Sequence, residues 1–347
     1  MEILSSSPEV GPALAALVDR LRRSDMRALA RCITLTEQGG PVSDLLHRSV
    51  YPMTGRASIV GFSGPPGAGK STLIDAFIGV LRARGRTVAV AAVDPSSPIS
   101  GGSVLGDRVR MQRHAEDPGV FIRSIASRGR LGGLSESIHR VVDLMDASGR
   151  DFVIVETVGA GQSEVEIVEV ADVVVVVNAP GLGDDIQAIK AGILEIADIL
   201  VVNKADLPLA GRTTGQLETM LKLRRERQDV PVIETVATTG AGVAGLAAAV
   251  EARAGKTAQE KRASRTKRVQ RLVAQLAGRR VCDAVLALTS AEAAAAIASA
   301  REGRISVAEA ADQVLRIVLR EQLSSPDVAS EIGLGGRAAP RTPRSAG

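Results

Sequence analysis

The sequence has 347 residues, enough for one large domain or two modest ones; 45% are hydrophobic and 24% charged, as in ordinary globular proteins. Four Phe, one Tyr and no Trp argue against a nucleic-acid surface on which bases stack. Basic residues number 43 and acidic residues 39, so the net charge of +4 is no strong signal of a basic patch. Two cysteines exclude a disulfide framework and a four-cysteine zinc site.

Targeting signals are not evident in the sequence. Residues 1–8 lack the basic and apolar segments of a secretory signal. No apolar run reaches the roughly 18 residues that a membrane span requires, since Asp172 and Asn178 bound the valines at 173–177. We therefore expect a cytoplasmic protein, with neither a membrane nor a nucleic acid among its partners.

The first part of the chain is predicted to be helical, at residues 8–50. Leu14, Leu17 and Leu21 recur at the spacing of a helix face, and similar spacing continues beyond them. The sequence Gly39-Gly40-Pro41 is expected to interrupt this helical stretch.

From residue 58 onward, short Val- and Ile-rich runs alternate with helical stretches. Apolar runs without polar alternation are typical of strands buried on both faces of a parallel sheet, and the whole pattern predicts a doubly wound α/β domain. Strands are expected at 58–64, 87–94, 119–125, 151–157, 172–178, 199–203 and 230–237. Helices are expected at about 70–84, 135–148, 163–171, 184–196, 213–227 and 243–253.

A phosphate-binding motif follows the first predicted strand. It reads Gly64-Pro65-Pro66-Gly67-Ala68-Gly69-Lys70-Ser71, with Thr72 after it, and it satisfies G-x-x-x-x-G-K-[ST] at every fixed position. The glycines allow main-chain N–H groups to surround phosphates, Lys70 brings a positive charge to the β and γ oxygens, and the Ser71 hydroxyl reaches Mg²⁺. A strand before the motif and a helix after it are the required context, so we interpret it as a P-loop.

A second motif, Asn203-Lys204-Ala205-Asp206, follows a later strand of the same predicted sheet. The Asp206 carboxylate can accept two hydrogen bonds from guanine, at N1–H and at the 2-amino group, and adenine lacks that pair of donors. The motif therefore favours GTP over ATP. Val236-Ala237-Thr238, at the end of the last predicted strand, suits a loop that supports the base through main-chain groups.

Three acidic residues are candidates for the Mg²⁺ site. Glu156 ends a strand three residues before Gly159, where a GTPase senses the γ-phosphate and holds Mg²⁺. Asp94 closes the second predicted strand, and Asp107 lies in a glycine-rich stretch suited to a switch. The structural alternatives are a surface carboxylate at Glu156, a helix cap at Asp94 and a solvated Asp107.

Other charged residues receive no catalytic assignment. Five arginines lie near that stretch, but solvated or partner-binding side chains explain each one as well as an arginine finger does. The three histidines are scattered through the chain. The arginines are Arg108, Arg110, Arg113, Arg128 and Arg130.

Taken together, the motifs resemble the MeaB/ArgK family, GTPases associated with methylmalonyl-CoA mutase and related cobalamin-dependent acyl-CoA mutases. The resemblance extends from about residue 25 to 250 and is looser in the C-terminal helices. Besides the two nucleotide motifs it rests on Val93-Asp94-Pro95-Ser96-Ser97, Gly101-Gly102-Ser103-Val104-Leu105-Gly106-Asp107-Arg108, Arg128-Gly129-Arg130-Leu131-Gly132-Gly133 and Glu156-Thr157-Val158-Gly159-Ala160-Gly161-Gln162-Ser163-Glu164.

The resemblance implies a G-protein chaperone that binds the mutase, gates loading of adenosylcobalamin, and protects or reactivates the enzyme. An adenosyltransferase is a further expected partner. By the same resemblance, Ser71, Asp94, Asp107 and Glu156 would surround Mg²⁺, with Lys70, Glu156 and Asp107 as the catalytic residues. The stretch at 181–190 would be an additional switch toward the mutase, carried by Asp184, Asp185, Gln187 and Lys190.

The same interpretation divides the chain into four parts. We expect an N-terminal helical extension at 1–52, a P-loop GTPase domain at 53–255, a C-terminal helical region at 256–325 that forms a homodimer, and a disordered tail at 326–347. The sequence has no D-x-H-x-x-G motif, so we expect that this chain binds no cobalamin itself and that the mutase is a separate polypeptide.

Three other functions agree less well with the sequence. A kinase or ATPase of an amino-acid transport system is disfavoured by the guanine-type motif and the lack of a membrane segment. A GTPase that matures nickel enzymes should carry a His- or Cys-rich tract, and three His and two Cys do not form one. A scaffold without enzymatic activity is disfavoured, because it would not need the complete group of phosphate-binding and Mg²⁺-binding residues that the motifs provide.

Overall fold

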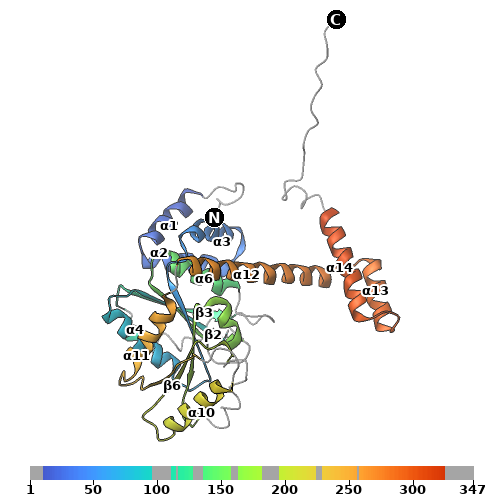
Figure 1. Ribbon diagram of the computed structural model, residues 1–347. Helices are drawn as coiled ribbons and strands as arrows, with labels where there is room; N and C mark the ends of the chain where they lie inside the picture. The colour runs from blue at the N-terminus through green and yellow to red at the C-terminus, as the bar shows by residue number, and fades with distance from the viewer. Residues whose placement is uncertain are drawn as a thin grey trace. The chain divides into compact units, whose positions relative to one another are not determined.

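The computed structural model describes residues 11–95, 111–114, 116–127, 136–157, 163–181, 195–223, 229–255 and 258–324 (Figure 1). The chain divides into two compact units, Met1–Arg268 and Val269–Gly347. The predicted tail at 326–347 lies outside the described residues.

The first unit is built on a seven-stranded, all-parallel sheet in the order β3-β2-β4-β1-β5-β6-β7. Each of the Val- and Ile-rich runs forms a strand, which confirms the predicted doubly wound α/β architecture. The strands are β1 (Ser58–Ser63), β2 (Val88–Pro95), β3 (Val120–Ser127), β4 (Phe152–Thr157), β5 (Val173–Asn178), β6 (Ile199–Asn203) and β7 (Val232–Thr235).

Burial explains why these runs lack polar alternation. Every residue of β4, β5 and β6 is buried, because helices cover both faces of the sheet. β1 lies between β4 and β5 and pairs with both, so the loop that leaves its carboxyl end lies at the centre of that edge. β7 is shorter than predicted: Pro231 has no N–H to donate, and beyond the strand Val236 forms an isolated bridge with Ala241.

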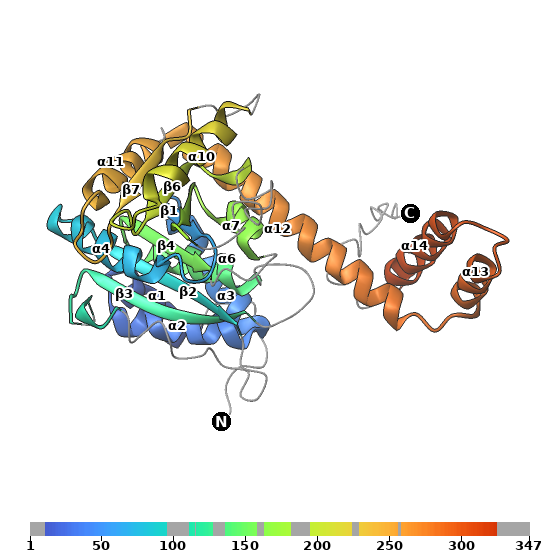
Figure 2. The same ribbon diagram turned by 90° about the horizontal axis from the view of Figure 1, so that it is seen from below.

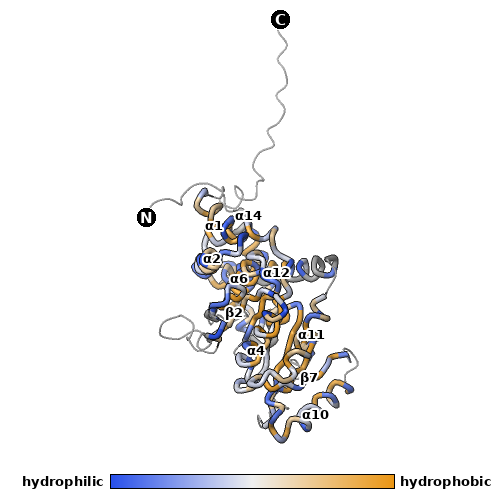
Figure 3. Tube along the Cα trace, turned by 90° about the vertical axis from the view of Figure 1, so that its left-hand side faces the viewer, coloured by the Kyte–Doolittle hydropathy of each residue, from blue (hydrophilic) through white to orange (hydrophobic). Residues whose placement is uncertain are grey.

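Two helices cover one face of the sheet, and three cover the other, one of which also contacts the N-terminal helices (Figure 2). Helices α4 (Lys70–Ala83) and α11 (Val243–Ala254) pack together with one set of strand side chains. Helices α6 (Glu136–Ala147), α7 (Ser163–Val170) and α10 (Ala210–Lys222) pack with the other set. The strands and α11 are strongly hydrophobic in Figure 3.

The N-terminal helical stretch is three helices, of which two pack against α6 and the first packs on those two. They are α1 (Pro12–Arg22), α2 (Met26–Gln38) and α3 (Gly40–Val50), followed by the 3-10 turn η1 (Tyr51–Met53). The predicted break is confirmed at Gly39, which joins α2 to α3 with φ of 72°. A break that we did not predict precedes α2, where the Asp25 carboxylate caps the helix by accepting from the N–H groups of Arg27 and Ala28.

Two predicted helices need comment: one begins earlier than predicted, and the other lies mostly outside the described residues. α10 begins at Ala210, three residues before the predicted start. The first turn was not predicted because glycines such as Gly211 and Gly215 have low helix propensity. Most of the helix expected at 184–196 lies outside the described residues.

A long helix, α12 (Ala258–Ala287), begins in the first unit and continues into the second. Its Arg265 stacks on the ring of Tyr51, with the guanidinium carbon 3.9 Å from the ring centroid. Arg265 also donates hydrogen bonds to the carbonyl oxygens of Tyr51 and Thr54. These contacts hold the start of α12 on the turn that leads into β1.

The second unit is helical. Besides the rest of α12 it contains α13 (Ala291–Arg301) and α14 (Val307–Ser324), which pack against each other. The Ser290 hydroxyl caps α13 by accepting from the Ala293 N–H. The core between these helices is small and consists of Ala293, Ala296, Val314, Ile317 and Val318.

Within the described part of the chain, no single helix combines the length and the apolar character needed to cross a membrane. One helix pair, Leu276–Ala287 with Ala291–Arg301, meets that criterion jointly but is bent by 92°.

Candidate functional site: a nucleotide pocket at the carboxyl edge of the sheet

The P-loop leaves β1 through a position that only glycine can occupy. Gly64 has φ of 136°, and a Cβ placed on it would lie 2.1 Å from the carbonyl oxygen of Val177 on the neighbouring β5. Gly67 and Gly69 also have positive φ, at 80° and 84°, conformations that favour glycine. The motif therefore folds as the predicted strand–loop–helix.

Lys70 and Ser71 form the first turn of α4 at the end of the loop, and both are buried. The Lys70 ammonium donates to the carbonyl oxygens of Gly64, at 2.6 Å, and Pro65, at 3.1 Å. The positive end of the α4 dipole and the cationic side chain thus lie at the same loop, which is the electrostatic arrangement that favours a phosphate.

The Ser71 hydroxyl donates to Glu156 Oε1 at 2.7 Å, in a buried hydrogen bond between α4 and the end of β4. A hydroxyl and a carboxylate oxygen side by side are hard oxygen donors of the kind that Mg²⁺ prefers, so this pair fits the expected ion. The two other proposed ligands are not tested by the structure. Asp107 lies outside the described residues, and of Asp94 only the main chain, in β2, is described.

Asn203 joins the base motif to the P-loop. Its side-chain amide, 1% exposed, donates to the Ala68 carbonyl oxygen at 2.9 Å, and its Oδ1 accepts from the Thr235 hydroxyl and the Ala237 N–H at 3.2 Å each. This one side chain thus connects the P-loop with the ends of β6 and β7. The local motif alone could not reveal this bracing role.

Lys204 adopts a left-handed conformation with φ of 57°, which is uncommon for a residue other than glycine. Its ammonium donates to the Gly67 carbonyl oxygen at 2.8 Å. The side chain therefore extends from the base motif back to the P-loop and forms one side of the space between them.

A cavity of about 250 Å³ lies between the P-loop and the base motif. This volume is somewhat below the range of about 300–1,000 Å³ typical of small-molecule sites, which suits a base and sugar whose phosphates extend out along the loop. Its lining contains the exposed Asp206 and one residue that we did not predict, Leu207. The lining residues are Gly69, Thr72, Asn203, Lys204, Asp206, Leu207, Val236, Ala237 and Thr238.

Leu207 was missed because the motif ends one residue earlier. Its side chain is 42% exposed, so its apolar surface is open to a ligand in the cavity. An apolar residue directly after a polar base motif was the signal that could have identified it.

The remaining candidates fall into two groups. Arg113 lies in the 3-10 turn η2 (Gln112–His114) and forms an ion pair with Asp75 of α4. The others lie outside the described residues: the predicted switch residues Asp184, Asp185, Gln187 and Lys190, and the arginines Arg108, Arg110, Arg128 and Arg130.

Comparison with known proteins identifies the family of the chain. Residues 29–290 match the family model described as methylmalonyl Co-A mutase-associated GTPase MeaB. The chain belongs to this family. Its MeaB membership agrees with the resemblance seen in the sequence motifs.

Named relatives of the MeaB-family chain are GTPases. A protein of Pyrococcus horikoshii provisionally named a GTPase is 49% identical over 276 residues, which are 76% of this chain and 87% of that protein. The GTPase ArgK of Escherichia coli is 45% identical over 197 residues, 56% of this chain and 60% of ArgK. The predicted enzyme class, GTPase, is confirmed.

A solved structure confirms the fold. The crystal structure of an LAO/AO transport system kinase superposes with a TM-score of 0.71 at 25% identity, covering 92% of this chain and 100% of that one.

Proposed function

We propose that the protein uses GTP hydrolysis as a timer for an adenosylcobalamin-dependent acyl-CoA mutase, gating cofactor loading and protecting or reactivating the mutase. The single observation that carries the nucleotide part is the cavity shared by the P-loop and the base motif. The mutase part is supported by the family description, methylmalonyl Co-A mutase-associated GTPase. A Caenorhabditis briggsae relative, 39% identical over 63% of this chain and 58% of its own length, is named a methylmalonic aciduria type A homolog.

In the proposed reaction, water attacks the γ-phosphorus of GTP, and the bond to the β–γ bridging oxygen breaks to give GDP and phosphate. Lys70 and the N–H groups of the loop at Gly67–Lys70 stabilise the charge that spreads over the phosphate oxygens. Ser71 and Glu156, with Asp94 and Asp107, would hold Mg²⁺, which when bound neutralises phosphate charge. Asp206 recognises guanine, and the loop at Val236, Ala237 and Thr238 supports it.

For Lys70 to reach a phosphate, its ammonium must give up the two carbonyl oxygens that it now contacts. A triphosphate offers stronger, charged acceptors in exchange. Substrate binding thus exchanges internal hydrogen bonds for charge-assisted ones at a site that the loop has already shaped.

The decisive test of the nucleotide part is Lys70→Ala with Lys222→Ala as its control, since Lys222 is exposed on α10. We expect Lys70→Ala to lower GTP turnover at least about 100-fold, the usual effect of removing one transition-state donor. Circular dichroism and the melting temperature should stay close to those of the unchanged chain. Normal turnover in Lys70→Ala would refute the assignment.

A homodimer formed by the second unit is also proposed. Apolar side chains on its helices are exposed, and its own core contains only five clustered residues among those that the structure describes. A contiguous exposed apolar surface marks an interaction site, and a second copy of this unit would cover these side chains. The exposed residues are Val273, Leu286, Ile297, Val307, Leu315 and Leu319.

One alternative has a specific observation in its favour, because the superposed crystal structure is named a transport system kinase. The two functions differ in what stimulates hydrolysis. We expect a purified acyl-CoA mutase to co-elute with the protein and accelerate its GTP turnover. Phosphorylation of a transport protein, with no response to any mutase, would favour the kinase instead.

A further inference from the structure

The cavity between the P-loop and the base motif is lined without an aromatic ring. The chain has only five Phe and Tyr side chains, and all of them lie at described positions. The four phenylalanines are each 8% exposed or less, and the tyrosine stacks on Arg265 of α12. The flat face of a base, which proteins often cover with an aromatic ring, therefore has no such partner here. The five residues are Tyr51, Phe62, Phe77, Phe121 and Phe152.

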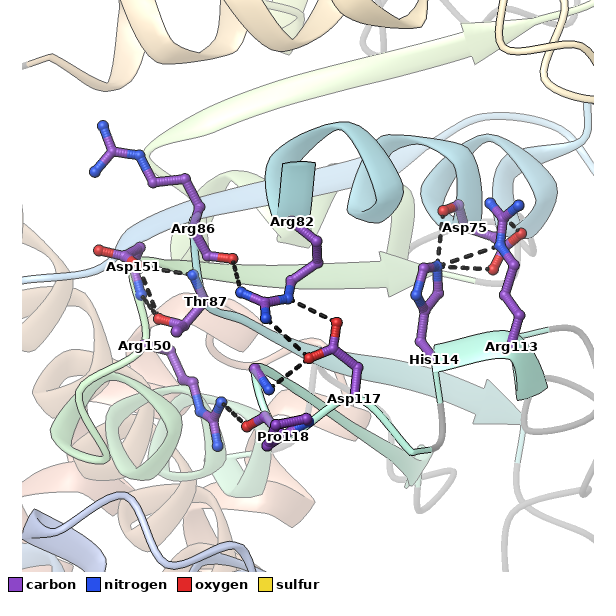
Figure 4. Close-up of polar contacts among 11 residues, drawn as sticks. Asp75, Arg82, Arg86, Thr87, Arg113, His114, Asp117, Pro118, Arg150 and Asp151 are labelled. Carbon is purple, nitrogen blue, oxygen red and sulfur yellow. Dashed lines mark hydrogen bonds and ion pairs between the residues drawn. The ribbon is translucent and has the colours of Figure 1, made fainter. Parts of the chain in front are cut away.

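The three histidine rings are also engaged away from the cavity. His114 lies against α4, with Nε2 3.2 Å from the Asp75 carboxylate and 3.1 Å from the Asp75 carbonyl oxygen, as Figure 4 shows. His47 pairs with Asp143 at 2.8 Å, and His139 is 3% exposed on α6. Aliphatic side chains must therefore supply the apolar part of the cavity wall.

Leu207 is the largest apolar side chain in that wall. It is 42% exposed, and it follows Asp206, the predicted acceptor for the polar edge of guanine. A base has polar groups along its edge and apolar surface on its two faces. Asp206 is suited to the edge, and Leu207 offers apolar area that a face of the base can cover.

The main chain fixes Leu207 at this position. Lys204 has a left-handed conformation with φ of 57°, and its carbonyl oxygen accepts from the Leu207 N–H at 3.0 Å, which closes a tight turn. The Ala205 N–H donates to the carbonyl oxygen of Thr235 in β7 at 3.0 Å. The Leu207 carbonyl oxygen accepts from the N–H of Ala210, where α10 begins, at 3.1 Å. The side chain is thus held at the cavity before a nucleotide binds, which lowers the entropic cost of the contact.

We infer that Leu207 packs on a face of the guanine base and positions the nucleotide for recognition by Asp206. This inference rests on the proposed function, because it presupposes that a guanine nucleotide occupies the cavity. A base face carries no pattern of donors and acceptors, so Leu207 contributes affinity for any purine, whereas Asp206 selects guanine by its hydrogen bonds.

The experiment compares Leu207→Ala and Leu207→Met with Leu209→Ala in the full-length protein, by calorimetry with GDP and Mg²⁺. Leu209 is a matched control, because it is 50% exposed and lies two residues further on, outside the cavity lining. We expect Leu207→Ala to lower GDP affinity about 5- to 30-fold, the effect of losing part of a leucine's apolar contact. Leu207→Met should restore most of it, because the two side chains have similar volumes, and Leu209→Ala should leave it unchanged.

Two further ligands distinguish a contact with the base from a general disturbance of the site. Inorganic pyrophosphate has no base, so Leu207→Ala should bind it as tightly as the unchanged chain does. Inosine diphosphate lacks only the 2-amino group of GDP and presents similar faces. Its affinity should fall by about the same factor as that of GDP, which keeps the ratio of the two affinities constant. Asp206→Asn, by contrast, should lower that ratio.

Three results would overturn the inference. The first is equal GDP affinity in Leu207→Ala and the unchanged chain, and the second is a parallel loss of pyrophosphate affinity in Leu207→Ala. The third is a changed ratio of GDP to inosine diphosphate affinity in Leu207→Ala, because the residue would then take part in selecting the base.

Failure of the proposed function would look different. If GTP turnover responds to no acyl-CoA mutase, the mutase part fails, and the calorimetry still decides the inference about Leu207. If the unchanged chain binds pyrophosphate but no GDP, the nucleotide part fails and the inference fails with it. Weaker GDP binding in Leu207→Ala, with unchanged pyrophosphate binding, supports the contact in every other case.

Discussion

The two units of this protein bury apolar residues to very different degrees. In the first unit, β4, β5 and β6 are buried along their whole length between two layers of helices. In the second unit the described core is a cluster of small and medium-sized residues, and leucines remain exposed on its helices. A unit with a dense core can hold a site rigidly, whereas a unit with a thin core gains stability from a partner.

Helix α14 shows the difference within a single element. Ala310, Val314 and Ile317 lie on a buried stripe, while Leu315 and Leu319, one turn apart, are 38% and 50% exposed. A helix with a second apolar stripe is suited to pack on two sides. Strands β4, β5 and β6 of the first unit have no such unused face.

The largest expected effect on stability comes from a substitution at Gly64, where the first unit leaves no space for a side chain. Gly64→Ala places a Cβ 2.1 Å from a β5 carbonyl oxygen in a backbone conformation that alanine rarely adopts. We expect a loss of about 3 kcal/mol or more in the free energy of unfolding, together with loss of nucleotide binding, measured by urea unfolding and calorimetry. Gly79→Ala on α4 is the control: a Cβ there meets nothing within 4 Å, so it should be neutral or stabilise by about 0.5–1 kcal/mol. Equal stability of the two variants would contradict the close approach.

The next effect concerns specificity within the first unit. Asp206→Asn removes the charged acceptor from the cavity lining, and hydrogen bonds to charged groups contribute about 1.5–3 kcal/mol. We expect GTP affinity to fall about 10- to 100-fold by calorimetry while ATP affinity stays low, so that the preference for GTP is lost. Glu218→Gln, an exposed change on α10, should leave the preference intact. An undiminished preference in Asp206→Asn would mean that another residue selects the purine.

A third change tests the thin unit. Leu319→Glu places a charge on the exposed stripe of α14 and should weaken self-association by about 2 kcal/mol per dimer, since each copy loses about 1 kcal/mol of apolar burial. Sedimentation at several concentrations should show more monomer, with helix content unchanged. Arg316→Glu is the control, because Arg316 is exposed on the same helix. A protein that is monomeric before any change would refute the proposed homodimer.

The smallest effect is a pH dependence in the first unit. Hydrogen bonds from Arg82 hold the pKa of Asp117 below its usual value of 3.8, so the folded state binds the Asp117 proton less readily than the unfolded state. The resulting stabilisation is present above about pH 4 and is lost as the pH falls through the lower pKa of the folded state. Asp117→Asn should therefore flatten the acid side of the stability curve by less than about 1 kcal/mol, measured by urea unfolding between about pH 3 and 6. An unchanged slope would show that the pair contributes nothing measurable.

Much of the first unit could be predicted because its signals are local. A Val-rich run such as that of β5 contains its own evidence of burial, and Gly64 and Gly69 mark a loop that no other residue can form. Contacts between distant residues were not predictable in this way. Asn203 was expected only as part of a base motif, and its hydrogen bond to Ala68 joins two residues that are 135 positions apart in sequence. The start of α2 was missed for a different reason: a lone Asp25 is a weak capping signal inside a long apolar pattern.

The sequence by itself determined the parallel sheet and the P-loop, and it predicts a preference for a guanine nucleotide, because each depends on residue types at short, regular spacing. Only the tertiary structure decided that Asn203 braces the P-loop, that Leu207 lines the cavity, and that Asp75 holds η2 on α4. Those contacts depend on strand order and helix placement, which bring remote residues together to bury apolar surface and satisfy polar groups, and no local spacing encodes that juxtaposition.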